Sequence, residues 1–392
     1  MPFHFFPIRN YSQRNVWTST FSFFINSTVR FFIPAILPFI ISALKISVYQ
    51  ASLLITAYWI GYTAFQIPAG IISDRFGTAK TSKASFLGLT IAFFLMPIAM
   101  HEYLLIFLLQ LLLGSLSSIV YVSGISLVQR SADQSNRSLF IGIFQIGFFM
   151  GSSVGEYIVL ELLDISFYYS YIAVSLLLLI SLTLDFLFQN EPGLSKKNNE
   201  IIPRGILYVS LIRFSAGFMY LGFLSLFTTF LVYDGIAPLS KAYAYAWIPA
   251  IGGIAGSPLG GMISRKMWHA KALMAIVPII VFSVVLMLIG IVNRNYVPPL
   301  SFATGFLYGL YAGPSMGLAS EVGREENLGT SSGILNFSSQ VGGIISPLAI
   351  GYLFTYFGNF KIPFAVISVL SFVIILFPLA IFLRRLFRHT VR

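Results

Sequence analysis

The sequence predicts an all-α polytopic membrane protein with twelve spanning helices in two pseudo-symmetric six-helix bundles. Hydrophobic residues make up 57% of the 392 residues and charged residues 9%, with a mean hydropathy of +0.85, whereas about 25% of a soluble domain is charged. Polar breaks divide the chain into apolar runs long enough to cross a bilayer core of about 30 Å. The second half also repeats the first, and this repeat predicts the two bundles.

The expected spans are helices rather than barrel strands, because lipid cannot satisfy backbone polar groups and the apolar runs lack alternating polarity. In chain order the spans cover residues 16–43, 50–72, 84–100, 103–128, 139–160, 166–188, 204–232, 240–263, 272–292, 298–320, 330–355 and 362–383. The polar stretch 189–203 is interpreted as a linker. We therefore expect an N-terminal bundle over residues 1–188 and a C-terminal bundle over residues 204–392.

The positive charges fall mostly on one side of the predicted topology. With the N-terminus inside the cell, most of the 24 Lys and Arg residues lie in cytoplasmic segments, as the positive-inside rule requires. We therefore expect a protein of the plasma membrane with both termini in the cytoplasm. The net charge of +11 requires no nucleic acid as a partner. The absence of cysteine excludes disulfides and thiolate metal sites, and we expect no cofactor.

The internal repeat relates residues at a constant offset of 191. The identical pairs include Gly70/Gly261, Ile72/Ile263, Ser73/Ser264, Ala79/Ala270, Lys80/Lys271, Ala84/Ala275, Gly142/Gly333, Ile143/Ile334 and Gly151/Gly342. Gly114 lies opposite Gly305 at this offset, and such small residues allow helices to approach closely. Repeated halves joined by a cytoplasmic linker are typical of transporters that bind their substrate near the bilayer midplane.

Residues 70–83, GIISDRFGTAKTSK, form a polar island between two apolar runs, and we predict a short membrane-surface loop there. The run 62–83 resembles the signature between helices two and three of the major facilitator superfamily. The sharpest matches are Gly70, Asp74, Arg75 and Gly77, together with residues 329–353 in the eleventh span.

The resemblance covers the whole chain and implies a gate at this loop. It implies that Gly70 lets helix two pack against helix eleven, and that Asp74 holds the inner gate shut in one state. A carboxylate there can face the positive N-terminal end of the helix that starts near Thr330. In the alternative interpretation, Asp74 and Arg75 are ordinary hairpin charges.

The chain departs from the family pattern at three places, and the last two argue against a drug–proton antiporter. Thr78 and Ala79 follow Gly77, where the family loop usually has two basic residues. Gln110 precedes Gly114 in place of the arginine that such antiporters often have. Such antiporters also have a Gly-Pro pair in helix five, whereas here Ser152 follows Gly151.

Two arginines lie inside apolar runs, and they are the main candidates for substrate binding. Arg30 lies midway along the first span and Arg213 near the middle of the seventh. A buried Arg costs at least about 2.5–3.5 kcal/mol, so it usually faces a cavity and has a partner or ligand. Because a guanidinium donates a bidentate fork to an oxyanion, we expect the pair to bind an anion. Alternatively, each pairs with a backbone carbonyl or with Glu156 and sets helix packing.

Other polar side chains in the spans complete the predicted site. Glu156 is the only acidic residue clearly within an apolar run and is the candidate coupling group, or else a helix-end carboxylate that reaches the interface. The uncharged residues expected to bind substrate are Tyr58, Tyr121, Gln145, Tyr311 and Asn336.

The leading hypothesis is a secondary transporter that moves a small anionic solute, an organic acid or a phosphorylated compound, by alternating access. We expect uptake coupled to protons or another ion, with membrane lipids as the other partners. The alternative is an exporter of amphipathic compounds. The spans contain no catalytic set of two carboxylates or clustered histidines, so no enzyme is expected.

Overall fold

Helices make up nearly all of the computed structural model, and no strand occurs among the residues that it describes. The described residues are 11–46, 48–133, 135–163, 165–192, 206–237, 245, 247–266, 271–322 and 328–390. Within this part of the chain, 7 helices are long and apolar enough to cross a membrane. The all-helical prediction is therefore confirmed.

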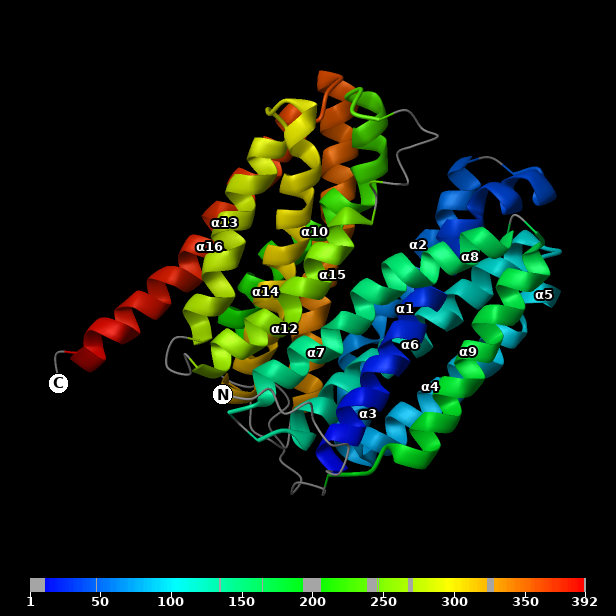
Figure 1. Cartoon of the computed structure of the whole chain (residues 1–392), viewed down its shortest axis with the longest axis horizontal. Coiled ribbons are helices and arrows are strands. Elements are labelled where there is room, and N and C mark those ends of the chain that lie inside the picture. The colour runs from blue at the N-terminus through cyan, green and yellow to red at the C-terminus, as the bar shows by residue number, and fades with distance from the viewer. Residues whose placement is uncertain are drawn as a thin grey trace.

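Two groups of helices follow each other along the chain (Figure 1). The first group comprises α1 (Tyr11–Leu44), α2 (Val48–Ala64), α3 (Gln66–Phe76), α4 (Thr78–Phe94), α5 (Met96–Ala99), α6 (Tyr103–Ser131), α7 (Arg137–Met150), the π-helical segment Gly151–Gly155, α8 (Glu156–Leu163) and α9 (Phe167–Phe188). The second comprises α10 (Ile206–Tyr233), α12 (Ile248–Lys266), α13 (Lys271–Ile289), the 3-10 turn Arg294–Tyr296, α14 (Val297–Val322), α15 (Leu328–Phe357) and α16 (Lys361–Thr390).

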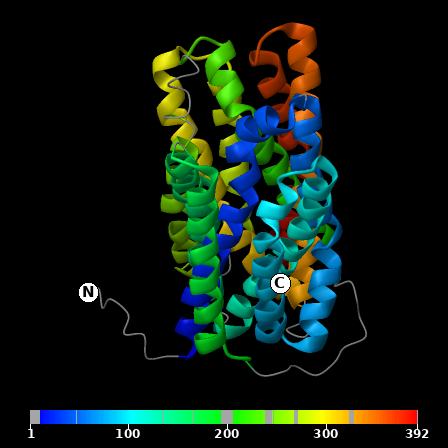
Figure 2. The same ribbon diagram turned by 90° about the vertical axis from the view of Figure 1, so that its right-hand side faces the viewer.

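Each group packs mainly within itself. In the first, α1 contacts α6, α7 and α9; in the second, α10 contacts α15 and α16, and α14 contacts α12 and α13. The groups meet where α3 packs on α15 and α7 packs on α12 and α14. Figure 1 shows that they converge toward the end where α1 begins and diverge toward the opposite end. In Figure 2 the first group faces the viewer and lies in front of the second. We call the end where α1 and α15 begin the closed end.

Glycines at equivalent positions allow close helix packing in both groups, as the repeat predicts. A Cβ added at Gly114 of α6 would collide with the carbonyl of Tyr58 in α2. A Cβ added at Gly305 of α14 would collide with the carbonyl of Pro249 in α12. Tyr58 and Pro249 are also separated by the offset of 191 residues. The two groups therefore repeat the same helix contact.

The predicted surface loop at residues 70–83 is wrong, because this stretch is almost entirely helical. α3 continues to Phe76 and α4 begins at Thr78. Gly77 alone makes the turn, with φ of 99°, a conformation that residues with a Cβ rarely adopt. The polar side chains do not break the helices, because other elements supply their hydrogen bonds.

One such element is the start of the predicted linker. The carboxylate of Glu191 accepts hydrogen bonds from the backbone N–H of Thr78 at 2.9 Å and of Ala79 at 2.9 Å, and from the Thr78 hydroxyl at 3.0 Å. Glu191 therefore caps the N-terminus of α4 from a position more than a hundred residues away. The rest of the predicted linker, from residue 193, and the predicted boundary at residue 204 lie outside the described residues.

Candidate functional site

A small cavity of about 30 Å³ lies between the two groups of helices, near the middle of their length. Its walls come from helices α1, α2, α6, α7, α10, α14 and α15. The lining residues are Phe23, Arg30, Tyr62, Tyr121, Gln145, Phe148, Phe149, Arg213, Leu221, Tyr308, Ala312, Asn336 and Gln340. Since one water molecule needs about 10–15 Å³ on this scale, the cavity has room for about two. A larger solute can enter only when the walls separate.

Arg30 is buried among aromatic rings and leaves hydrogen-bond donors unused. Its guanidinium carbon lies 4.4 Å from the ring centroid of Tyr62, 5.5 Å from that of Trp59 and 5.6 Å from that of Phe148. Ring faces attract a cation. However, Nε and Nη2 of Arg30 have no hydrogen-bond partner among the described residues. A buried charge with unpaired donors beside a cavity is suited to bind an oxyanion.

Arg213 differs because neighbouring side chains hold both of its Nη atoms, although its Nε, like that of Arg30, has no hydrogen-bond partner among the described residues. Nη1 donates to the hydroxyl of Ser315 at 3.3 Å, and Nη2 donates to Oδ1 of Asn336 at 3.2 Å. Nδ2 of Asn336 in turn donates to Oε1 of Gln66 at 2.9 Å. Since Gln66 lies on α3 and the others lie on α10, α14 and α15, this chain of hydrogen bonds connects the two groups. Arg213 thus orients Asn336 as well as facing the cavity.

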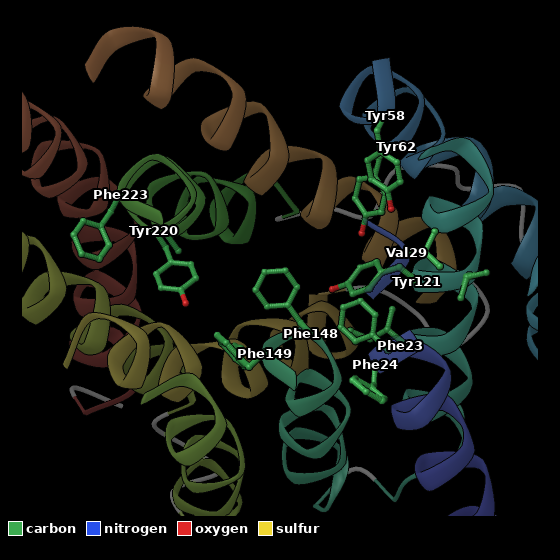
Figure 3. Packing of buried hydrophobic residues seen from close by; sticks show 14 of the residues in the cluster. Phe23, Phe24, Val29, Tyr58, Tyr62, Tyr121, Phe148, Phe149, Tyr220 and Phe223 are labelled. Atoms are coloured by element: carbon green, nitrogen blue, oxygen red, sulfur yellow. The ribbon is translucent and has the colours of Figure 1, made fainter. Parts of the chain in front are cut away.

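Aromatic side chains from both groups form much of the cavity wall. Figure 3 shows Phe23, Tyr121 and Phe148 gathered on the first group, with Phe149 reaching toward Tyr220 on the second. Phe23 stacks on Phe144 with ring centroids 4.7 Å apart, and Tyr220 stacks on Tyr308 with centroids 4.0 Å apart. Nε2 of Gln145 donates to the Tyr121 hydroxyl at 3.3 Å. The wall therefore combines apolar ring faces with a few amide and hydroxyl groups.

At the closed end, Asp74 joins three helices. Its Oδ1 accepts a hydrogen bond from Nη2 of Arg130 at 2.7 Å and from the backbone N–H of Gly329 at 2.9 Å. Its Oδ2 accepts from the backbone N–H of Thr330 at 2.8 Å and from its hydroxyl at 2.7 Å. The carboxylate on α3 therefore binds α6 and the N-terminal end of α15. Burial raises the pKa of Asp74, while these donors and the charge of Arg130 act in the opposite direction.

Further contacts between the groups lie near this end. The side chain of Gln129 on α6 donates to the carbonyl of Met316 at 3.3 Å and accepts from the Ser332 hydroxyl at 3.0 Å. A Cβ added at Gly70 would lie 2.6 Å from Cα of Thr330, and one added at Gly261 would lie 2.5 Å from Cα of Leu139. These two crossings are equivalent under the offset of 191, so both groups contribute one to the closed end.

The family model described as Major Facilitator Superfamily matches residues 19–347. The chain belongs to the major facilitator superfamily. Members of this superfamily are transporters rather than enzymes, and the chain is therefore an integral membrane transporter. The resemblance stated from the signature residues is confirmed.

Two curated members of the superfamily are similar to the chain in sequence. The hexuronate transporter of Bacillus subtilis (strain 168) is 22% identical over 354 residues, which cover 83% of each chain. The probable galactarate/D-glucarate transporter of Escherichia coli (strain K12) is 28% identical over 167 residues, which cover 39% of this chain and 37% of that one.

A solved structure of the superfamily shows the same fold. FucP, the fucose:proton symporter of Escherichia coli, in the outward conformation, superposes with a TM-score of 0.75 at 17% identity. The similarity covers 95% of this chain and 99% of FucP. The major facilitator fold is therefore shared over almost the whole length of both chains.

The cavity of this major facilitator chain brings together part of the predicted site. Arg30, Arg213, Gln145, Asn336 and Tyr121 all line it. Tyr58 and Tyr311 do not line it and instead lie buried behind the wall. The Tyr311 ring centroid lies 5.6 Å from the guanidinium carbon of Arg213.

The remaining predicted residues lie elsewhere. Gly77 makes the turn after α3, and Arg75 beside it is exposed. Glu156 begins α8, but its side chain lies outside the described residues. Among the wall residues, Tyr62 was not predicted for the site. Its position on the helix that faces Arg30 could have identified it. The aromatic composition of the chain alone does not reveal which ring faces that arginine.

One buried acidic residue was also missed. Asp185 of α9 is fully buried, although Glu156 is the only acidic residue that the apolar pattern singles out. Asp185 lies three residues before the end of α9, where a carboxylate is expected to reach the membrane surface. The packing of α1 against α9 covers it instead.

Proposed function

We propose that this major facilitator chain moves a small carboxylated solute of the sugar-acid class into the cell by alternating access. In this proposal twelve spans form two six-helix bundles, residues 1–188 and 204–392. The protein lies in the plasma membrane, and both of its termini lie in the cytoplasm. Transport is coupled to an ion, with protons as the candidate.

The observation that carries the proposal is the environment of Arg30. Its Nε and Nη2 are buried donors without partners among the described residues, and they lie beside the cavity. Leaving donors of a charged group unpaired in a buried site is costly. A bound carboxylate would supply the missing acceptors, and two parallel N–H···O bonds to one carboxylate fit the guanidinium fork.

The sugar-acid class is supported by the rest of the wall. A sugar acid combines a carboxylate, several hydroxyls and an apolar ring or chain face. Gln145, Asn336 and Gln340 offer amide groups to hydroxyls, and Tyr62, Phe148 and Tyr308 offer ring faces. The names of the two curated relatives, a hexuronate transporter and a probable galactarate/D-glucarate transporter, describe substrates of this class.

The closed end supports alternating access. We propose that Gly70, Asp74, Arg75 and Gly77 belong to the cytoplasmic gate, which is closed in this conformation. Asp74 bonds to α15 only when α3 and α15 are in contact. Opening the gate separates those helices and gives the cavity access to the cytoplasm. Arg213 and Asn336, which connect to Gln66 on α3, lie on the path between the cavity and the gate.

The test is thermal stabilisation of the purified protein by candidate ligands. A ligand that binds only the folded state raises stability by RT ln(1 + [L]/Kd). We expect D-glucuronate and galactarate to stabilise the wild type, whereas the neutral sugar glucose has no effect. The variant Arg30→Gln should lose this stabilisation. Arg294→Gln, which removes an exposed charge at the opposite end from the gate, should keep it.

A second function is favoured by the aromatic wall, namely export of amphipathic compounds. The same panel separates the two functions. If cationic or neutral amphiphiles stabilise the protein, and the variant Arg30→Gln responds as the wild type does, the export function replaces the sugar-acid proposal.

A further inference from the structure

Asp185 forms a buried polar site inside the first group of helices, separate from the cavity. The side chain is fully buried between α1 and α9. The Ser22 hydroxyl on α1 lies 2.7 Å from Oδ1 and 2.8 Å from Oδ2 of this carboxyl group. The Ser181 hydroxyl lies 3.0 Å from that of Ser22. Gln189, just after α9, places its amide group 2.5 Å from Oδ1.

No cation pairs with this carboxyl group in the part of the chain that the structure describes. The basic residues on the adjoining elements bind elsewhere. Lys83 on α4 donates from Nζ to the carbonyl of Phe186 at 3.4 Å. Arg14 on α1 lies over the ring of Phe188 at 6.0 Å. An ionised carboxylate buried without a cation is costly, and such groups usually become neutral.

Gln189 provides a second, independent observation. Its Oε1 is buried and has no hydrogen-bond partner among the described residues. Which end of an amide faces a neighbour is assigned from the hydrogen-bond pattern. With Oε1 turned toward Asp185, a protonated carboxyl O–H donates to it. The separation of 2.5 Å lies below the usual range of N–H···O bonds and at the lower limit of the range of O–H···O bonds.

We propose that Asp185 is a proton-binding site that holds its proton at neutral pH. The proton comes from water at the closed end, converts the carboxylate to the neutral acid, and returns to water when the acid ionises. Ionisation would place an unpaired negative charge against Ser22 and so change how α9 holds α1. Arg30 lies on α1 eight residues after Ser22, or roughly 12 Å along the helix. The link from Asp185 to Arg30 rests on the proposed function, whereas the protonation of Asp185 does not depend on it.

The first experiment measures protonation directly. Infrared spectra of the purified protein are recorded across a pH series, and the carbonyl band of a protonated carboxylic acid is followed. At neutral pH the wild type should show a band that Asp185→Asn lacks. Glu102→Gln, which removes an exposed carboxyl group outside α6, should retain the band. If the spectra of wild type and Asp185→Asn have the same band, Asp185 is ionised and the proposal fails.

Thermal unfolding gives a second readout. If the folded state holds the proton more tightly than the unfolded chain, stability falls as pH rises through the titration of Asp185. The Asp185→Asn variant should lose this decline and match the wild type at neutral pH. A strongly destabilised variant with an unchanged pH profile overturns the proposal. Stabilisation of the wild type by sodium chloride but not by choline chloride, absent in Asp185→Asn, also overturns it in favour of a sodium site.

If Asp185→Asn does not yield folded protein, Gln189→Leu takes its place in the infrared test. This variant keeps Asp185 and removes the proposed acceptor of its proton. The carboxylic acid band should then remain and move to higher frequency, and an unmoved band contradicts the proposal.

The transport consequence is tested last. Asp185→Asn should bind D-glucuronate as the wild type does but lose the pH dependence of its uptake. Retention of the pH dependence overturns the coupling role alone. If glucuronate does not bind the wild type, the sugar-acid proposal fails, and the infrared result on Asp185 still stands by itself.

Discussion

At the scale of single residues, Asp74 carries hydrogen bonds across the closed end. Its two oxygens accept from the Arg130 guanidinium and from three donors of Gly329 and Thr330. Hydrogen bonds to charged groups contribute about 1.5–3 kcal/mol each. The bonds to α15 exist only in the closed arrangement, so they shift the equilibrium between conformations toward it.

Replacing Asp74 with Asn should weaken the closed end while leaving the protein folded. The loss of one charge-assisted bond, about 1.5–3 kcal/mol, corresponds to a shift of roughly tenfold to a hundredfold in the ratio of closed to open molecules. The measurement is the alkylation rate of a cysteine introduced at Gln340 in the cavity, with an impermeant reagent on the cytoplasmic side. The chain has no other cysteine. We expect faster labelling in Asp74→Asn.

The matched control is Asp133→Asn, which removes an exposed carboxylate after α6. Its labelling rate should equal that of the parent chain with the cysteine at position 340. Equal rates for Asp74→Asn and the parent chain would remove Asp74 from the proposed gate.

Residues of the site differ in how far sequence alone identifies them. Arg30 and Arg213 stand out because each is a charge inside a long apolar run. Their different partners could not be predicted, since Ser315 and Asn336 come from other helices. Asp185 was missed because its position near a helix end gives no sign of its burial. That burial depends on how α1 packs across α9.

At the scale of elements, the turn between α3 and α4 depends on a residue distant in sequence. Backbone N–H groups in the first turn of a helix have no partner within the helix, and two of those in α4 donate to Glu191. A negative charge is also favourable at a helix N-terminus. The cap therefore ties the residues that follow α9 to the signature segment.

Glu191→Ala should remove this cap and lower the stability of the protein by about 0.5–2 kcal/mol, the usual cost of losing an N-cap side chain. The measurement is thermal unfolding of the purified protein. Glu161→Ala, at an exposed position on α8, is the control and should unfold like the wild type. If the two variants have the same unfolding temperature, the contacts of Glu191 contribute nothing to stability.

The apolar runs predicted which segments are helical, but they did not predict where the helices end. The polar letters of residues 70–83 predict a loop, yet only Gly77 departs from helical structure. Polar residues remain helical here because Glu191, Arg130 and the start of α15 satisfy them. Those partners are far away in the sequence, so a local pattern cannot include them.

At the scale of the whole molecule, two equivalent crossings hold the closed end together. Gly70 on α3 meets Gly329 and Thr330, and Gly261 on α12 meets Ser138 and Leu139. Each crossing leaves no space for a side chain. Because both lie at the same end, the two groups diverge toward the opposite end (Figure 1).

Gly70→Val and Gly261→Val should therefore both open the closed end. A side chain at either position collides with backbone that cannot move without separating the helices. The measurement is the distance between spin labels on cysteines introduced at Lys80 and Lys266, which are exposed on α4 and α12. Both variants should show longer distances than the parent.

Gly351→Val is the control, because a Cβ added there lies within 4 Å of no atom of the described residues. Its distances should match those of the parent. If Gly70→Val opens the end and Gly261→Val does not, the two crossings are not equivalent in strength, contrary to the repeat.

The repeat at an offset of 191 predicted close helix approaches at Gly114 and Gly305, and the structure shows both of them. It could not predict which end is closed, since one chain must be compatible with both conformations of a transporter. Which conformation is favoured depends on a free-energy difference of a few kcal/mol between the contacts at the two ends. Such small differences leave no periodic pattern in a sequence.

The aromatic surroundings of Arg30 have an optical consequence. Trp59 is one of only four tryptophans in the chain, and the Arg30 guanidinium carbon lies 5.5 Å from its ring centroid. Indole emission depends on the charge and the solvent near the ring. In the proposed function, a carboxylate bound to the guanidinium would change the electric field at Trp59. Binding of such a solute would then be seen as a change of intrinsic fluorescence, without any attached dye.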